Sequence, residues 1–68
     1  MGARDILSAN LRRLRQMRGL SQEELAHRAD IDRTYISALE RGVYSATVDI
    51  LDRLAAGLEI DAWELLKA

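Results

Sequence analysis

Apolar residues recur at every third or fourth position along the chain, which is the spacing of amphipathic α-helices. Four segments carry this pattern and a shorter fifth one follows them: residues 4–18, 22–29, 33–41, 48–58 and 62–66. The positions expected to be buried are mostly leucine, isoleucine and alanine, namely Leu7, Leu11, Leu14, Met17, Leu25, Ala26, Ala29, Ile36, Leu39, Val48, Leu51, Leu54, Ala55 and Leu58. The pattern therefore predicts an all-α fold, a compact five-helix domain.

Short polar residues and glycines mark the predicted helix ends. Ser21 and Glu24 form a capping-box pattern at the start of the second helix. Asp32 is placed to cap the third helix, and Gly42 to end it. Because only three residues separate the second helix from the third, we expect these helices to cross steeply. Within that turn, Asp30 is expected in the left-handed backbone conformation, which aspartate tolerates better than most residues.

The composition limits the classes of protein to which the chain can belong. It has 68 residues and no cysteine, which allows one small core and excludes disulfides and thiolate metal sites. No apolar run approaches the ~18 residues of a membrane span, and the N-terminus has no signal-peptide pattern. We therefore expect a soluble, cytoplasmic protein that forms a single domain over residues 1–68, with no membrane partner.

Residues that could support catalysis or bind a metal are scarce. His27 is the only histidine, and no carboxylate cluster stands near it at metal-ligand spacing. The serines have local structural uses, and the sequence has neither a nucleophile–base pair nor a glycine-rich phosphate loop. We therefore expect no catalytic site, no metal, no cofactor and no small-molecule substrate.

Charge is distributed unevenly along the chain, although the formal net charge is only −1. Residues 1–41 hold eight arginines against six acidic residues, whereas residues 42–68 hold two basic residues against five acidic ones. The planar guanidinium group of arginine suits phosphate and guanine better than the lysine ammonium does. A solvated surface can show the same asymmetry, so charge alone leaves nucleic-acid binding open.

Residues 20–39 read LSQEELAHRADIDRTYISAL and resemble the helix-turn-helix of the lambda-repressor and Cro family, also called the Xre family. Apolar residues stand where that motif places them, at Leu25, Ala26, Ala29, Ile31, Ile36 and Leu39. The similarity continues through Arg41-Gly42 and LAAGLEIDAWELL, and DRTYIS resembles the controller proteins of restriction–modification systems. The resemblance implies a lambda-repressor-like domain whose second and third helices form the helix-turn-helix, with double-stranded DNA as partner.

The same resemblance implies that the helix at residues 33–41 enters the major groove of DNA. The outer face of this helix carries basic and hydrogen-bonding side chains and no carboxylate. Arg33 can donate two hydrogen bonds to guanine O6 and N7, and Thr34 can bond a base or place its methyl group against thymine. Ser37 and Ala38 are smaller and permit close approach. We predict that these four residues read the bases.

Contacts with DNA phosphates are expected at both ends of the motif. Ser21 and Gln22 lie at a helix N-terminus, where backbone N–H groups attract phosphate oxygens, and family members commonly use the residue at the Gln22 position for such a contact. Arg41 and Tyr44 are the candidates at the other end. Tyr35 has two interpretations, since its ring can pack at the edge of the core or its hydroxyl can bind a phosphate.

Glu40 stands at the margin of the core-facing side of its helix, where a lone charge is unfavourable. Relatives in the family pair an arginine with a glutamate at the positions of Arg15 and Glu40. The resemblance therefore implies a structural ion pair between the first helix and the third.

The C-terminal segment contains more apolar surface than one small core is expected to cover. One interpretation is that Trp63 folds back onto the first or fourth helix. The other is a dimer interface formed by Trp63, Leu65 and Leu66. A homodimer also suits DNA binding, because two-fold partners read half-sites about one helical turn (~34 Å) apart.

Taken together, these features predict a sequence-specific DNA-binding transcriptional regulator, not an enzyme, which reads a roughly palindromic operator as a homodimer. The alternative is a protein-interaction module on the same fold, such as an antitoxin or anti-regulator, without specific DNA readout. The net negative charge and the loop VYSAT after Gly42, where many relatives carry basic residues, keep this alternative open. The intact face formed by Arg33 and Thr34, which carries no carboxylate, argues against it.

Overall fold

The computed structural model describes residues 2–68, and all the regular secondary structure in that range is helical. Its elements are α1 (Ala3–Met17), α2 (Gln22–Ala29), α3 (Arg33–Glu40), α4 (Val48–Leu58) and the 3-10 helix η1 (Ala62–Leu65). The all-α prediction is confirmed, with one correction: the fifth segment is a 3-10 helix, so there are four α-helices among the described residues rather than five. A segment of four residues is too short for a stable α-helix and commonly tightens to the 3-10 form.

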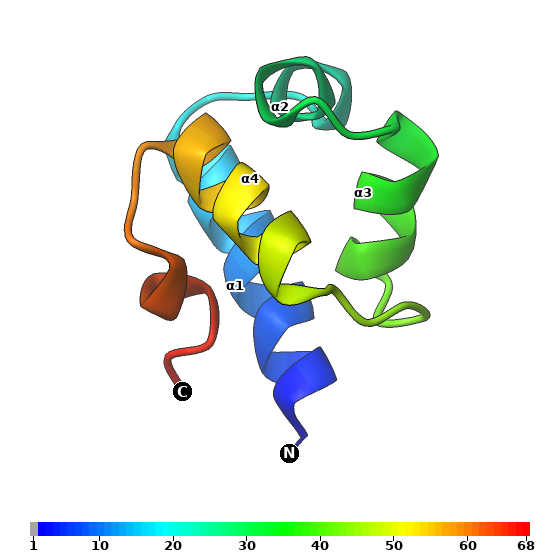
Figure 1. Ribbon diagram of the computed structural model, residues 1–68, viewed down its shortest axis with the longest axis vertical. Helices are drawn as coiled ribbons and strands as arrows, with labels where there is room; N and C mark the ends of the chain where they lie inside the picture. The colour runs from blue at the N-terminus through cyan, green and yellow to red at the C-terminus, as the bar shows by residue number, and fades with distance from the viewer. Residues whose placement is uncertain (1) are drawn as a thin grey trace.

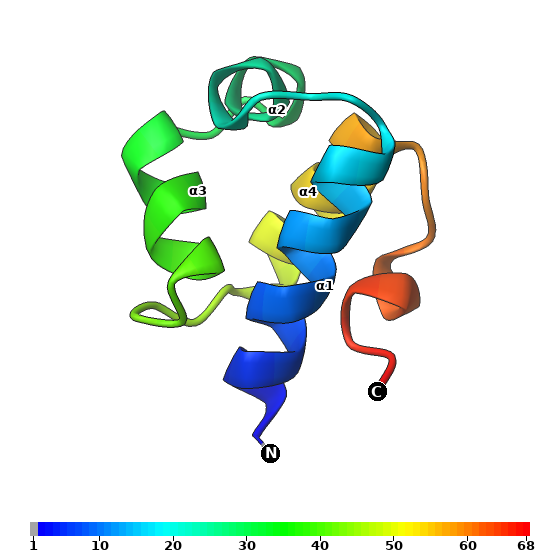
Figure 2. The ribbon, with the colours of Figure 1, turned by 180° about the vertical axis from the view of Figure 1, so that it is seen from behind.

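The four α-helices and η1 surround one set of buried side chains. In Figures 1 and 2, α2 lies across one end of α1 and α4, α3 lies on one side of these two helices, and η1 lies on the other side. Helix α2 contacts both α3 and α4, and α1 contacts both α3 and η1. The outer side of α3 is therefore left facing solvent, away from the C-terminal segment.

The predicted helix caps are present. The Ser21 hydroxyl accepts a hydrogen bond from the Glu24 backbone N–H at 3.0 Å, and the Glu24 carboxylate accepts one from the Ser21 N–H at 2.9 Å. Hydrogen bonding of the Glu24 carboxylate to Ser21, to its backbone N–H first and then to its side chain, lowers the pKa of Glu24. Asp32 caps α3 and Thr47 caps α4 by accepting from backbone N–H groups at 2.8 and 3.1 Å. Each cap satisfies donors that a helix start otherwise leaves without a partner.

The turn between α2 and α3 depends on one residue in the left-handed conformation. Asp30 has φ 56° and ψ 50°, as predicted. The reversal brings the Ile31 N–H within 3.0 Å of the Ala26 carbonyl oxygen, which accepts its hydrogen bond. With the chain turned so sharply, α3 begins at Arg33, and only three residues separate it from the end of α2.

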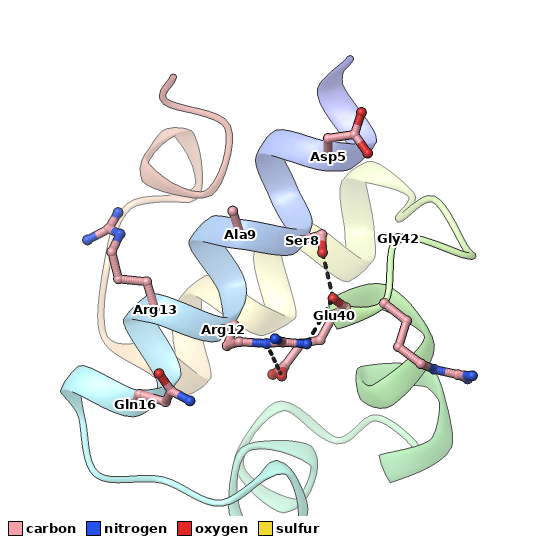
Figure 3. Close-up of a pocket in the computed structure, with 9 residues that line it drawn as sticks. Asp5, Ser8, Ala9, Arg12, Arg13, Gln16, Glu40 and Gly42 are labelled. Atoms are coloured by element: carbon pink, nitrogen blue, oxygen red, sulfur yellow. Dashed lines mark hydrogen bonds and ion pairs between the residues drawn. The ribbon is translucent and has the colours of Figure 1, made fainter. Parts of the chain in front are cut away.

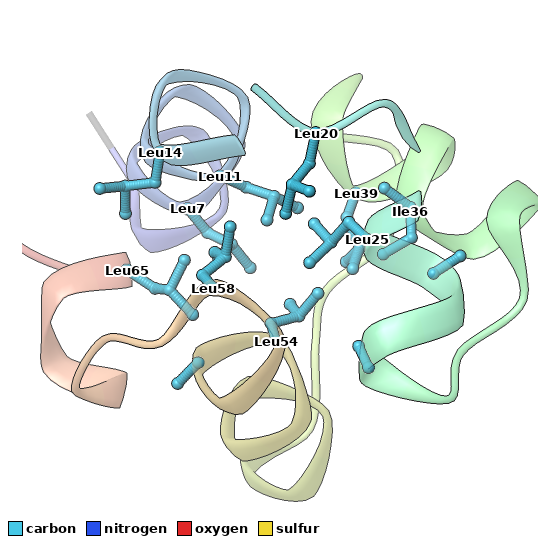
Figure 4. Packing of buried hydrophobic residues seen from close by; sticks show 13 residues of the cluster. Leu7, Leu11, Leu14, Leu20, Leu25, Ile36, Leu39, Leu54, Leu58 and Leu65 are labelled. Carbon is cyan, nitrogen blue, oxygen red and sulfur yellow. The ribbon is translucent and has the colours of Figure 1, made fainter. Parts of the chain in front are cut away.

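The hydrophobic core is formed mainly by leucines, several of which have no exposed surface (Figure 4). Its buried members are Leu7, Leu11, Leu14, Leu20, Leu25, Ala26, Ala29, Ile36, Leu39, Leu54, Ala55, Leu58 and Leu65. Two predicted core residues are wrong: Met17 is 72% exposed and Val48 is 75% exposed. At ~100° per residue, Met17 points about 90° away from the centre of the α1 stripe, and Val48 about 70° from that of α4.

Glycine fixes the closest approach of α2 and α4. A β-carbon at Gly57 would lie 3.1 Å from the Leu25 side chain and 3.3 Å from the Ala29 backbone nitrogen. The second contact involves backbone, which cannot rotate away as a side chain can. Helix α4 therefore packs against α2 at a distance that only glycine allows without displacing Leu25 or Ala29. This close packing helps to hold α2, the first helix of the helix-turn-helix, in place.

A buried carboxylate joins the first three helices. The Glu40 side chain is 1% exposed, and it accepts hydrogen bonds from Arg15 of α1 at 2.6 Å (Nε to Oε2) and 3.0 Å (Nη2 to Oε1). It also accepts one from Gln22 of α2 at 3.2 Å. These contacts with Glu40 raise the pKa of Arg15. Figure 3 shows Ser8 and Arg12 of α1 reaching Glu40 as well, and both donate to its backbone carbonyl.

Removing Arg15 takes away the closest partner of the buried Glu40 carboxylate and leaves only Gln22 at 3.2 Å and Arg12 at 3.7 Å beside it, so Arg15 and Glu40 are expected to be strongly coupled. Arg15→Met and Glu40→Leu should each lower the free energy of unfolding by about 3–5 kcal/mol, and the double variant by less than either. Urea denaturation followed by circular dichroism measures all four proteins. Losses that simply add in the double variant would show that the pair does not act as a unit.

Candidate nucleic-acid interface

Helix α3 divides its residues between the core and the solvent. Ile36 and Leu39 are 0% exposed and hold the helix against the rest of the molecule. Arg33 and Thr34, in the first turn, are exposed, and Ser37 one turn later is half-buried. The first turn of α3 therefore presents a guanidinium group and a hydroxyl group to solvent on a helix whose position the core fixes.

Ala38 is the least accessible of the four residues predicted to read bases. It is only 5% exposed, because it lies on the α3 face that turns toward the following loop. It forms part of a depression with Thr34, Tyr35, Arg41 and Tyr44. With so little surface, the Ala38 methyl group has almost nothing to offer a base edge, so we exclude it from the candidate readers.

A carboxylate lies closer to the reading face than the sequence pattern indicates. Asp32, the cap of α3, is exposed, and its Oδ1 accepts from the Thr34 backbone N–H at 2.8 Å and from the Thr34 hydroxyl at 2.6 Å. These hydrogen bonds, that from the side chain first, hold the pKa of Asp32 below its usual value. The face is thus not free of acidic groups at its N-terminal edge, and the Thr34 hydroxyl has a fixed partner.

The start of α2 lies beside the Glu40 carboxylate. The Gln22 side chain is half-buried, and its amide nitrogen donates to Glu40 at 3.2 Å. The Ser21 hydroxyl is engaged in the capping box. What this end of α2 still offers a phosphate is chiefly its first-turn backbone N–H groups, which have no acceptor within the helix.

Tyr35 holds the loop that follows α3. Its ring packs against the core cluster, its hydroxyl donates to the Ser45 carbonyl oxygen at 3.2 Å, and it meets the ring of Tyr44 edge to face with centroids 5.9 Å apart. Tyr44 remains 59% exposed. The packed interpretation of Tyr35 therefore describes its position in this structure, while Tyr44 keeps surface available for a partner.

Arg41 connects the reading face with a second depression. It follows α3 and lines both the depression around Ala38 and a groove between α1 and the end of α3. Figure 3 shows that groove, to which α1 contributes Arg12 and Arg13. The sequence pattern gave no reason to place these two α1 arginines near the end of α3, because their proximity depends on how the helices pack.

The structure separates the three C-terminal residues assigned to a dimer interface. Trp63 is 60% exposed and Leu66 is 42% exposed, but Leu65 is 0% exposed and belongs to the core. Leu65 is therefore wrong as an interface residue, because its side chain faces α1 and α4 while its neighbours point outward. Leu66 lines an apolar depression with Leu7 and Leu51.

A buried asparagine, which sequence reasoning missed, fixes this C-terminal segment. Asn10 of α1 is 8% exposed and donates from its amide nitrogen to the carbonyl oxygens of Leu65 at 3.0 Å and Lys67 at 2.8 Å. The Lys67 ammonium group lies 5.6 Å from the centre of the Trp63 ring, in cation–π geometry. Trp63 is thus exposed on a segment that is itself tied down.

Within residues 2–68, no group of three or more His, Cys, Asp or Glu side chains is arranged to hold a metal ion. His27 is exposed on α2. Over the same residues, no helix is both long enough and apolar enough to cross a membrane.

Residues 11–62 match the family model described as helix-turn-helix. A hypothetical transcription factor of Neisseria meningitidis serogroup B is 41% identical over 63 residues, covering 93% of this chain. This chain spans only 59% of the length of that Neisseria protein. Control protein C.SmaI of Serratia marcescens is 38% identical over 66 residues, covering 97% of this chain and 79% of its own.

Solved structures show the same arrangement of helices. The crystal structure of a hypothetical transcription factor from Neisseria matches with a TM-score of 0.93 at 39% identity, over 97% of this chain and 76% of the other. The restriction–modification controller protein C.AhdI from Aeromonas hydrophila matches with a TM-score of 0.88 at 37% identity, over 91% of this chain and 94% of its own. Both the sequence and the fold are therefore similar to those of transcription factors and controller proteins.

Proposed function

The chain belongs to the helix-turn-helix family, and from this we propose that it is a transcriptional regulator that binds a roughly palindromic DNA operator as a homodimer. The observation that carries the proposal is the first turn of α3. There, Arg33 and Thr34 are exposed on a helix that the core and the Glu40 carboxylate hold in place. A side chain reads a base only if its helix is rigidly positioned in the groove.

We assign base readout to Arg33, Thr34 and Ser37. Arg33 carries a forked donor that matches guanine O6 and N7, the commonest specific contact between proteins and DNA. A cation at the start of a helix slightly destabilises the helix. A contact between Arg33 and DNA would offset this small loss of stability with a gain in binding. Ser37 lies one turn further along and has less exposed surface.

We assign phosphate contacts to the two ends of the motif. The N–H groups at the start of α2, at Ser21 and Gln22, attract an anion through their partial positive charge. Arg41 and Tyr44 are exposed after α3 and supply a guanidinium group and a phenolic hydroxyl. Such contacts fix the position of α3 on the duplex but carry no sequence information.

We propose that the homodimer forms through the C-terminal side of the molecule, around Trp63 and Leu66. Both are exposed and Leu66 lines an apolar depression, whereas isolated soluble domains rarely leave large apolar side chains grouped at the surface. Helix α3 lies on the opposite side of the molecule (Figure 1). A contact on the C-terminal side would leave α3 of both copies uncovered, which the reading of two half-sites about one helical turn (~34 Å) apart requires.

The base-reading role of Arg33 predicts a loss of specificity on substitution. With an operator obtained by selection from random duplexes, Arg33→Ala should weaken binding to that operator by about 1–3 kcal/mol and binding to random duplex DNA much less. Arg33→Lys is the matched control, because it keeps the charge and loses the planar fork. It should therefore bind random DNA like the original protein but discriminate poorly. Fluorescence anisotropy with both duplexes measures the two affinities, and equal losses on both would remove Arg33 from base readout.

Arg41, as a phosphate contact, should behave differently. Arg41→Ala is expected to weaken binding to operator and to random DNA alike, and to lower the slope of log K against log [salt] by about 1. The measurement is a salt titration of both complexes. A loss confined to the operator would instead make Arg41 a base-reading residue.

Trp63 should be required for the dimer. Trp63→Ala is expected to convert the dimer to monomer at micromolar concentration, measured by sedimentation equilibrium. Met17→Ala is the control, since Met17 is similarly exposed on a different part of the surface and its removal should leave the mass unchanged. An unchanged mass for Trp63→Ala would exclude this interface.

A further inference from the structure

One pair of groups at the start of α3 has a fixed hydrogen-bond direction. Asp32 Oδ1 accepts two hydrogen bonds from Thr34, one from its hydroxyl at 2.6 Å and one from its backbone N–H at 2.8 Å. Both residues are exposed, and both lie next to Arg33, the proposed guanine reader. The pair therefore sits where the identity of a neighbouring base would be decided.

The chemistry of the pair leaves the Thr34 hydroxyl with one role toward a ligand. An ionised carboxylate has no proton to give, so the hydroxyl must donate in this bond. The hydrogen bonds from Thr34 keep the pKa of Asp32 below its usual value, so Asp32 stays ionised at neutral pH. With its single proton committed, the Thr34 hydroxyl offers only lone pairs to anything else.

Base edges in the major groove differ in whether they present a hydrogen-bond donor or an acceptor to such a hydroxyl. Adenine N6 and cytosine N4 carry amino groups that donate, whereas thymine O4 and guanine O6 accept. A hydroxyl that can only accept forms a hydrogen bond with the first two and faces the lone pairs of the last two. A threonine without a fixed partner could rotate its proton and serve either kind.

We infer that Asp32 sets the base preference of Thr34, so that the protein selects adenine or cytosine beside the guanine read by Arg33. Asp32 is a positioning residue in this scheme, and Thr34 is the group that touches the base. The inference rests on the proposed function, because it presumes that α3 lies in the major groove. It adds a donor–acceptor order to the readout: Arg33 only donates, and Thr34 only accepts.

The test uses two sets of duplexes. In each set, the base pair on one side of the guanine contacted by Arg33 is varied through all four possible base pairs. At the position facing Thr34, the original protein should bind the two duplexes whose strand nearest Thr34 carries adenine or cytosine about two- to tenfold more tightly than the two in which that strand carries thymine or guanine. Thr34→Val keeps the shape and removes the hydroxyl, so this ratio should fall to about one. Thr34→Ser keeps the hydroxyl and should retain it.

Variants of Asp32 separate base preference from helix capping. Glycine is tolerated at a helix start, so Asp32→Gly should cost only a few tenths of a kcal/mol of stability. The substitution frees the proton of the Thr34 hydroxyl, so the ratio should approach one. Asp32→Asn keeps an oxygen acceptor and should preserve the ratio. Thr47→Ala is the control for lost capping, since it removes the cap of α4 and should leave the ratio unchanged.

The outcomes distinguish a failure of the role inferred for Asp32 from a failure of the proposed function. If the original protein discriminates among the duplexes but Asp32→Gly keeps the same ratio, the role of Asp32 is overturned and the proposed function stands. The same holds if Thr47→Ala lowers the ratio as far as Asp32→Gly does, since the effect would then be one of helix stability. If the original protein prefers the operator to random duplex DNA but binds all the flanking variants equally, the inference fails and the proposed function stands. If it does not distinguish the operator from random duplex DNA, both fail.

Discussion

The buried carboxylate of Glu40 is the interaction on which the arrangement of the other helices depends. It lies near the end of α3, yet its partners come from α1, through Arg15, and from α2, through Gln22. Arg15 also donates to the Leu20 carbonyl oxygen at 2.8 Å, which ties the segment between α1 and α2 to the same group. A buried charge is costly unless it is fully hydrogen-bonded. The native packing of these helices is thus the one that satisfies Glu40.

This constraint explains how so small a molecule can hold a helix rigidly at its surface. Helix α3 has only eight residues, too few to be stable alone. Ile36 and Leu39 anchor its inner side, Glu40 fixes its end, and Asp32 caps its start. Arg33 and Thr34 then project from a helical turn that is fixed before it by the Asp32 cap and after it by the buried part of α3. Readout of a base edge requires this rigidity.

The features that could be predicted from the sequence are those that depend on local chemistry. The bounds of α2 and α4, the capping box at Ser21 and the left-handed Asp30 all follow from residues within a few positions of one another. The errors arise where distant segments decide. Met17 and Val48 are exceptions, because they are exposed and their angular distance from the centre of each apolar stripe could be calculated from the sequence. Leu65 is buried because η1 returns to α1, and Asn10 bonds to carbonyl groups 55 and 57 residues away, which no periodicity reveals.

The candidate interface shows the same division. The exposed first turn of α3 could be predicted, since Arg33 and Thr34 lie on the side of the helix opposite its apolar residues. The burial of Ala38 could not, because it depends on the loop held by Tyr35. The Asp32–Thr34 pair spans only two residues, so local chemistry alone is enough to predict it.

The central claim is that this fold presents α3 to a specific DNA sequence, twice, in a symmetric complex. Selection of bound molecules from a pool of random duplexes, followed by sequencing, tests it most directly. The account predicts enrichment of one two-fold-symmetric sequence whose half-sites contain guanine and lie about one helical turn (~34 Å) apart. Recovery of duplexes with no common sequence would contradict specific readout, and enrichment of a single unsymmetrical half-site would contradict the dimer.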